Sequence, residues 1–363
     1  MAAHRVVVVG GGFAGLAVAQ GLKRADAQIT LIDRQNYHLF QPLLYQVATG
    51  GLSPANIATP LRAILRRQKN ATVLQGEVFA MSGEQCSVSF RCGLTGETTT
   101  VNYDTLVVAT GAGHHYFGND HYEPLAPGLK TIQDATEIRA RILSAFEAAE
   151  LATSEEDQRR RMTFVVVGAG PTGLELSGTI AELARQTLPS EFRNVDTSLA
   201  RVLLVEGQDR VLPTYPERLS ESAARQLEKI GVTVRTSTLV NAIDESTVEL
   251  KEGDRLETVA TECVFWAAGV KASPLADELA KLNDSELDRA GRVAVDLDCS
   301  LPGVSNVFVL GDMASFTDAS GKVLPGTAAV AGQQGKHVAR QIRRRLAGQS
   351  TQEFRYRDLG EMA

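Results

Sequence analysis

The sequence is short of the residues that mark several classes of protein. Its 363 residues include four cysteines, too few for a disulfide scaffold in a chain this long, and none stands in a Cys-x-x-Cys pair. No apolar run reaches the ~20 residues of a membrane span. Lys and Arg number 37 against 43 Asp and Glu, and this net charge of −6 argues against general nucleic-acid binding. We therefore expect a chain from a reducing, cytoplasmic compartment.

What the sequence does contain is one unit that occurs twice. Residues 5–33 and 163–206 each read as a β-branched strand, a Gly-rich turn, a helix and a second strand that ends in an acid. The turns are Gly10-Gly11-Gly12-Phe13-Ala14-Gly15 and Gly168-Ala169-Gly170-Pro171-Thr172-Gly173. In such a turn the first Gly allows a tight bend, the second lets the backbone approach a pyrophosphate, and the third lets the helix pack closely. The pattern predicts an α/β fold with two Rossmann-like dinucleotide-binding domains.

The acids Asp33 and Glu206 stand where a carboxylate accepts hydrogen bonds from an adenosine ribose. Glu206 is followed by Gly207 and not by a basic residue, which favours NADH over NADPH because a 2′-phosphate needs a cationic partner. The alternative is that Glu206 is only a solvated strand end. The second copy is longer than the usual spacing, and we expect its helix to be followed by an excursion around 189–199.

Two dinucleotide sites in one chain suggest one tightly held redox cofactor and one exchangeable nicotinamide. A predicted strand over 103–109 runs into the small-residue turn Thr110-Gly111. Another over 304–310 ends at Gly311-Asp312, where a carboxylate can bind ribityl or ribose hydroxyls. This order of elements favours FAD in the first site and NADH in the second.

The combination resembles the two-dinucleotide-binding flavoproteins and, among them, the type II (non-proton-pumping) NADH:quinone dehydrogenases. The resemblance covers nearly the whole chain and is most specific at 37–50, 126–132, 168–175, 192–194, 265–270 and 311–312. It implies that NADH passes a hydride to FAD, which then gives two electrons to a quinone without proton pumping.

The resemblance also implies a division of the chain. We expect a discontinuous FAD domain over 1–113 and 285–345 and an NADH domain over 114–284. Residues 346–363 would be the start of a C-terminal membrane-docking region that is truncated here. The fragment would be soluble, while the complete protein would lie peripherally on the cytoplasmic side of the cell membrane. A homodimer is left open.

The residues expected to bind the cofactors come from these motifs and from the resemblance. Those for FAD are Gly10, Gly12, Phe13, Ala14, Gly15, Asp33, Arg34, Gln41, Pro42, Thr110, Gly111, Gly311, Asp312, Ala329 and Val330. Those for NADH are Gly168, Gly170, Pro171, Thr172, Gly173, Glu206, Ala268 and Gly269. Segment 37–50 would line the flavin, although it is half apolar and also fits a core helix that starts at a proline. We expect no metal, since His114, His115 and His121 follow no standard ligand spacing.

Two side chains are candidates for the chemistry. Glu175, two residues past the last Gly of its turn, is expected in the first turn of the helix, and the resemblance gives it a role in placing the nicotinamide or delivering a proton. It could instead only stabilise the helix dipole. Gln333 is the candidate quinone contact, or a plain polar helix residue. The family pattern Ala-Gln-x-Ala-x-Gln is kept at Ala328, Ala331 and Gln333, but Ala329 replaces its first Gln.

A helix is predicted from Ala328 to Leu346, and its N-terminus would stabilise negative charge on reduced FAD if aimed at the flavin pyrimidine. Its last turn holds Arg343-Arg344-Arg345, which either meets anionic lipid or solvates the helix end. No cysteine pair follows the first turn, so a thiol relay is not expected. Two other functions stay open: an NADH-dependent reductase of a ferredoxin- or rubredoxin-type protein, and a redox-responsive FAD/NADH-binding protein.

Overall fold

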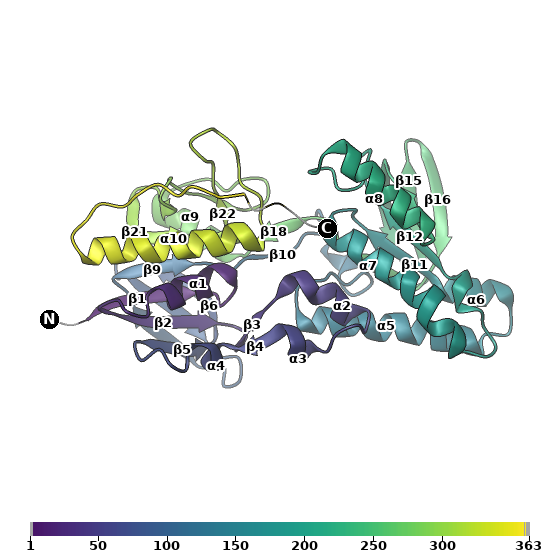
Figure 1. Ribbon diagram of the computed structural model, residues 1–363, viewed down its shortest axis with the longest axis horizontal. Helices are drawn as coiled ribbons and strands as arrows, with labels where there is room; N and C mark the ends of the chain where they lie inside the picture. Colours follow the sequence, from purple (N-terminus) through teal and green to yellow (C-terminus); the bar gives the residue numbers. More distant parts are fainter. Residues whose placement is uncertain (1–2, 359, 361–363) are drawn as a thin grey trace. The chain divides into compact units, whose positions relative to one another are not determined.

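The computed structural model describes residues 3–358 and 360 and has two compact units (Figure 1). The first unit takes in 3–39, 58–113 and 270–360, and the second takes in 40–57 and 114–269. Each has its own parallel sheet and covering helices. The predicted α/β class is therefore confirmed.

The unit boundaries differ from the predicted domain boundaries in two places. Segment 40–57 belongs to the second unit because α2 (Leu44–Ala48) packs on α5 (Ile132–Leu151) and α7 (Pro171–Glu182). The chain enters the first unit again at Val270, since α9 (Leu275–Asn283) packs on β6 (Glu77–Ser82) of that unit. The assignment of FAD and NADH to the two parts stays a prediction.

Six strands form the main sheet of the first unit, in the order β20-β21-β9-β1-β2-β5. All neighbouring pairs are parallel except β20 and β21. The strands are β20 (Ser300–Leu301), β21 (Val304–Val309), β9 (Thr105–Val108), β1 (His4–Val9), β2 (Ala27–Asp33) and β5 (Ala71–Gln75). The central strand β1 is buried on both sides from Val6 to Val9, as a β-branched run in a parallel sheet should be.

Three helices, α1 (Phe13–Gly21), α4 (Leu61–Leu65) and α10 (Ala328–Leu346), share one apolar core cluster with this sheet. We call them the helix layer. Because they share this cluster, they cover the same face of the sheet, and Figure 1 shows α10, α1 and α4 one after another across it. The bounds of α10 are those predicted from the sequence. A second cluster joins the sheet to α9 and to the antiparallel strands β6, β7 (Ser87–Arg91) and β8 (Thr98–Asn102).

The second unit has a parallel sheet in the order β13-β12-β11-β17. Its strands are β13 (Val232–Arg235), β12 (Arg201–Val205), β11 (Thr163–Val167) and β17 (Cys263–Trp266). An antiparallel sheet follows, made of β14 (Thr238–Ile243), β15 (Thr247–Glu252) and β16 (Arg255–Ala260). After α7 comes a π-helical turn, Leu183–Thr187, and then the 3₁₀ turns Leu188–Ser190 and Thr197–Leu199, which confirm the predicted excursion.

The other elements are short or lie at the edges. They are α3 (Pro54–Ile57), α6 (Glu155–Arg161), α8 (Glu217–Lys229), β3 (Tyr37–Leu39), β4 (Ala58–Pro60), β10 (Ala112–His114), β18 (Val270–Ala272), β19 (Val293–Ala294) and β22 (Ala314–Ser315). Segment 37–50 is therefore not the single core helix of the alternative reading. In the described part of the chain, no helix is both long enough and apolar enough to cross a membrane.

Candidate functional site

The first glycine-rich turn is too tight for side chains at two of its three signature glycines. Gly10 has φ +102°, and a Cβ there would lie 2.3 Å from the carbonyl oxygen of Ala109. A Cβ on Gly15 would lie 1.9 Å from the carbonyl oxygen of Gly10. Gly12 instead faces open space, with no atom within 4 Å of a Cβ built there. The turn thus leaves a cradle at Gly12 where a pyrophosphate can approach the backbone.

Asp33 holds this turn in place at the end of β2. One carboxylate oxygen accepts a hydrogen bond from the N–H of Gly11, and the other accepts one from the N–H of Gln35 at 2.6 Å. Burial raises the pKa of Asp33, and these backbone hydrogen bonds oppose the shift. Each oxygen keeps a further lone pair, so the carboxylate can still accept ribose hydroxyls.

The second turn repeats this geometry. Gly168 has φ +98°, and its Cβ would lie 2.7 Å from the backbone of Ala268. A Cβ on Gly173 would lie 1.8 Å from the carbonyl oxygen of Gly168, while Gly170 faces open space. The sequence assigned both turns to dinucleotides, and both have the backbone that such ligands need.

Glu206 holds the second turn as Asp33 holds the first. Its carboxylate accepts hydrogen bonds from the N–H of Ala169 at 2.8 Å and from the N–H of Gln208 at 2.9 Å. The alternative of a merely solvated strand end is therefore wrong. The donors, which are the backbone N–H groups of Gly11, Gln35, Ala169 and Gln208, were not predicted. Because every non-proline residue has such an N–H, the residue types gave no signal for them.

The helices that follow the turns begin without a side-chain cap. Gly12 and Gly170 are the N-cap residues of α1 and α7, and Pro171 opens α7. Phe13, Ala14 and Thr172 stand in the first turns of these helices, which contain no acidic residue. Backbone N–H groups at the N-terminus of each of the two helices therefore remain available to an anion, as in other phosphate sites at helix starts.

The turn after β9 and the turn after β21 contribute polar atoms to the first unit. The hydroxyl of Thr110 is buried and, among the described residues, has no hydrogen-bond partner. Gly111 and Gly311 have φ +69° and +67°. The N–H of Gly311 donates to the side-chain oxygen of Gln334 at 2.8 Å, so this buried Gln orients the Gly311-Asp312 turn. The orphaned hydroxyl of Thr110 fits the hydroxyl-rich chain of FAD.

Gln334 is a residue that the sequence analysis missed. Its neighbour Gln333 was preferred, yet the structure buries Gln334 on the inner side of α10. Val330, Ala331, Gln334 and Val338 are all buried at helical spacing, so the periodicity was a usable signal.

Near the start of α10, two predicted contacts have partners within the protein. Thr327 caps the helix by accepting the N–H of Val330, so this N–H is not free for a ligand. The amide of Gln333 donates to the carbonyl oxygen of Arg357 at 2.9 Å and accepts from its N–H at 3.0 Å. Ala329 precedes both of these residues, in the first turn of α10.

The C-terminal segment 349–358 lies along α10 within the first unit. Besides the Gln333 pair, His337 contacts the carbonyl oxygen of Gln352 at 3.0 Å, and buried Phe354 packs against Phe316. Residues 359 and 361–363, which belong to the predicted membrane-docking start, lie outside the described residues.

Glu175 is not in the first turn of its helix. Because α7 begins at Pro171, Glu175 is its fifth residue, so the proposed stabilisation of the helix dipole loses its basis. Burial raises the pKa of the Glu175 carboxyl to about 7. In the described part of the chain no side chain donates a hydrogen bond to this carboxyl, so it can change its protonation near neutral pH.

The segment at 40–57 places its predicted residues within the second unit. The side chain of Gln41 donates to the carbonyl oxygen of Lys130 at 3.1 Å, and Pro42 stands at the start of a 3₁₀ turn, Gln41–Leu43. Arg34, in the first unit, accepts a hydrogen bond at its carbonyl oxygen from Gln75.

The residues after β17 pack against the second glycine-rich turn. Ala268 packs its backbone against Gly168, and Gly269 has φ +69° with Phe117 beside it. His114, whose spacing fits no standard metal-ligand pattern, contacts the carboxylate of Asp134 at 3.1 Å. That carboxylate also accepts the N–H groups of Lys130 and Thr131, so this contact has a structural explanation.

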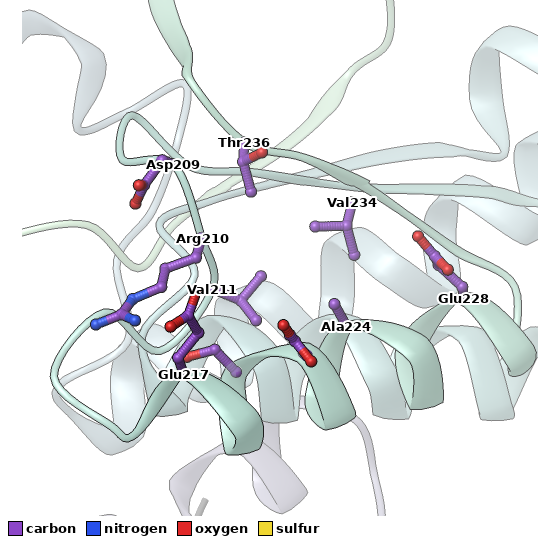
Figure 2. A pocket seen from close by; sticks show the side chains of 10 residues that line it. Asp209, Arg210, Val211, Glu217, Ala224, Glu228, Val234 and Thr236 are labelled. Carbon is purple, nitrogen blue, oxygen red and sulfur yellow. The ribbon is translucent and has the colours of Figure 1, made fainter.

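A surface pocket of about 390 Å³ lies between α8 and the end of β13 (Figure 2). Its lining includes the carboxylates of Asp209, Glu217, Glu221 and Glu228 but only one cation, Arg210. Such a lining repels phosphates. This pocket is therefore unsuited to the pyrophosphate of a dinucleotide.

Comparison with known proteins agrees with this geometry. A family model described as pyridine nucleotide-disulphide oxidoreductase matches residues 4–335. The type II NADH:quinone oxidoreductase Ndh of Mycobacterium tuberculosis is 48% identical, over 99% of this chain and 77% of that protein. The type II NADH:quinone oxidoreductase of Staphylococcus aureus is 32% identical, over 98% of this chain and 86% of that protein.

The fold has solved counterparts. The structure of NDH2 from Plasmodium falciparum in complex with NADH has a TM-score of 0.87 at 18% identity and covers 94% of this chain and 83% of that one. The chain belongs to the type II NADH:quinone oxidoreductases, within the pyridine nucleotide-disulphide oxidoreductase family. It lacks the cysteine pair that disulfide reductases carry after the first turn, and its four cysteines are free.

Proposed function

We propose that this chain oxidises NADH and reduces a quinone through bound FAD, without pumping protons. The observation that carries the proposal is the pair of turns clamped by Asp33 and by Glu206, in a chain that shares 48% of its residues with a type II NADH:quinone oxidoreductase. One chain with two such turns is built for a resident cofactor and an exchangeable one.

FAD belongs to the first unit in this proposal. When bound, it accepts a hydride from NADH and passes two electrons on. Asp33 binds the adenosine ribose, and the free N–H groups at the start of α1 hold the pyrophosphate across Gly12. The hydroxyl of Thr110 and the carboxylate of Asp312 hold hydroxyls of the cofactor. Arg34, Gln41, Pro42 and Ala329 stay predicted contacts.

NADH belongs to the second unit. Glu206 accepts the hydroxyls of the adenosine ribose while it keeps its own turn in shape. A 2′-phosphate there would meet a carboxylate, and this repulsion selects NADH over NADPH. The N–H groups at the start of α7 hold the pyrophosphate across Gly170.

Glu175 holds or releases a proton close to the nicotinamide end of this site. Its pKa of about 7 lets the carboxyl exist in both protonation states at neutral pH, which a group that moves a proton requires. Reduction of a quinone consumes two protons along with two electrons, so a group of this kind has a use in the cycle.

The acceptor side of the proposal is a quinone head group at Gln333. The amide of Gln333 is engaged by Arg357, so this pair must open before the amide binds a quinone. A peripheral position on the cytoplasmic side of a membrane, through a C-terminal region, is a further part of the proposal, and a homodimer stays open.

The absorption spectrum of the purified protein tests the proposal. We expect a yellow protein whose flavin absorbance bleaches when NADH is added without oxygen and returns when a soluble quinone follows. A colourless preparation that takes up no added FAD would contradict the proposal. Recovery only with a ferredoxin or rubredoxin would favour the protein reductase instead.

A further inference from the structure

The helix layer of the first unit has a one-sided charge. Segments 13–25, 61–70 and 328–346, which contain α1, α4 and α10, hold eleven Lys or Arg and no Asp or Glu, although the whole chain has a net charge of −6. The rest of the chain has no such excess of positive charge, so the excess belongs to this layer and does not reflect the overall composition.

The cations of these segments lie together in space. The side chain of Gln68 donates to the carbonyl oxygen of Ala19 at 2.7 Å, and that of Asn70 donates to Leu22, so the end of α4 adjoins the end of α1. A Cβ on Gly21 would lie 2.5 Å from the Cβ of Ala339, so the end of α1 also adjoins α10. The apolar sides of all three helices face the sheet, and their charged sides therefore face solvent.

Nine of the eleven cations are exposed, and we call them the cationic face. They are Lys23, Arg24, Arg62, Arg66, Arg67, Lys69, Lys336, Arg340 and Arg343. Among the residues that the structure describes, none of the nine has a carboxylate within ion-pair distance, and Asp26 is the acid next to them in the chain.

The arginine run at the end of α10 shows the contrast. Arg345 turns inward, where its guanidinium lies 4.7 Å from the ring centre of Phe308 and 3.5 Å from the carboxylate of Asp298. Arg343 belongs to the cationic face. The run therefore combines one structural arginine with one that remains available to a partner.

We propose that the cationic face docks on a bilayer of anionic phospholipid. This rests on the proposed function, because a lipid-soluble quinone requires the enzyme to reach a membrane. Unpaired Lys and Arg close to an anionic bilayer each strengthen binding about fivefold. The face carries no exposed aromatic side chain on which nucleic-acid bases could stack, which favours lipid over single-stranded RNA.

Cosedimentation of the FAD-loaded full chain with vesicles tests the proposal. The vesicles contain phosphatidylglycerol with phosphatidylcholine, or phosphatidylcholine alone. The variant R24Q/R67Q/R340Q removes one cation from each of the three segments, and we expect roughly 100-fold weaker binding to the anionic vesicles. The control K251Q/R289Q/K322Q makes the same change in net charge at exposed positions outside the helix layer and should bind like the unmodified chain.

Equal binding of the two triple variants would overturn the proposal, and so would equal binding of the unmodified chain to both kinds of vesicle. Tighter binding to single-stranded RNA than to the anionic vesicles would assign the face to nucleic acid. Turnover of NADH with a soluble quinone, measured without vesicles, tests the proposed function separately. Normal turnover with unchanged vesicle binding by the helix-layer variant refutes the docking surface alone.

Discussion

The turn at Gly10–Gly15 and the turn at Gly168–Gly173 have the same backbone geometry, and each donates a hydrogen bond to an acid from the neighbouring strand. The length of chain between turn and acid, however, differs greatly. Asp33 follows Gly11 by 22 residues, whereas Glu206 follows Ala169 by 37. Parallel pairing of β1 with β2, and of β11 with β12, fixes the acid in both cases. Spacing along the sequence is thus a weaker criterion than the order of strand, turn, helix and strand.

The surroundings of the two turns differ as well. Leu61 of α4 lies over the first turn, where a Cβ on Gly11 would be 2.6 Å from it, while the second turn accommodates the buried Ala169. The first unit adds Thr110 and the Gln334-held Gly311. The second unit adds Glu175 with its raised pKa. The proposed function gives the groups around the first turn a role in retaining FAD, and it gives Glu175 beside the second turn a role in the reaction.

The largest effect should come from the glycines that pack against their own turns. In both Gly15→Ala and Gly173→Ala the new Cβ would meet a backbone oxygen at under 2 Å. We expect each variant to lose about 3–5 kcal/mol of unfolding free energy, measured in urea without cofactors. The matched controls Gly12→Ala and Gly170→Ala face open space and should keep their stability. If one turn tolerates the change, the two turns are not equivalent.

Charge reversal at the second acid should change the choice of coenzyme. Glu206→Arg removes the ribose acceptor and supplies a partner for a 2′-phosphate, so kcat/KM should shift from NADH toward NADPH by roughly 100-fold. Glu206→Gln keeps the shape and removes the charge without adding a cation, so it should weaken NADH and shift kcat/KM toward NADPH less than the Arg variant does. An unchanged preference in the Arg variant would remove Glu206 from the ribose site.

The open glycines should separate the two cofactors. A methyl group at Gly12 should reduce the flavin retained during purification, whereas one at Gly170 should leave the flavin in place and raise KM for NADH about tenfold. Absorbance of the purified variants and steady-state kinetics measure the two effects. Loss of flavin from the Gly170 variant would reverse our assignment of the units.

Glu175→Gln should remove a pH dependence that belongs to the second unit. The inflection of kcat near pH 7 should disappear, with about a tenfold loss of rate. The folded carboxyl keeps its proton up to about pH 7, and the unfolded one releases it near 4.5. Stability should therefore fall as the pH rises through this window, and it should fall less in the Gln variant. A pH profile that the substitution leaves unchanged would exclude Glu175 from proton transfer.

The smallest effect is expected on the acceptor side of the first unit. Gln333→Ala should raise KM for a soluble quinone about threefold and leave KM for NADH unchanged. The loss is small because the amide is already engaged by the backbone of Arg357. A change in both constants would point to α10 packing and not to a quinone contact.

The sequence was sufficient for features that depend on local backbone chemistry. Both turns, both acids and the bounds of α10 follow from glycine geometry, strand ends and helical periodicity. Thr110 and Asp312 could be named as candidate coenzyme contacts because small residues and an acid follow buried strands.

Features that depend on tertiary packing could not be predicted from the sequence. Segment 37–50 is short and apolar, and such a run does not distinguish a 3₁₀ turn with a short helix from one core helix. The raised pKa of Glu175 comes from burial, which no motif encodes. The choice between Gln333 and Gln334 depends on which side of α10 meets the sheet.

Asp33 and Glu206 have one more consequence. Each fastens two backbone N–H groups before any nucleotide arrives, so folding itself has already ordered these loops. At the second turn, where we propose that NADH binds, spent coenzyme can leave and fresh coenzyme can enter without the turn having to refold. An enzyme of this kind releases its oxidised electron donor after every cycle. A binding turn that is already ordered without ligand removes a delay between one turnover and the next.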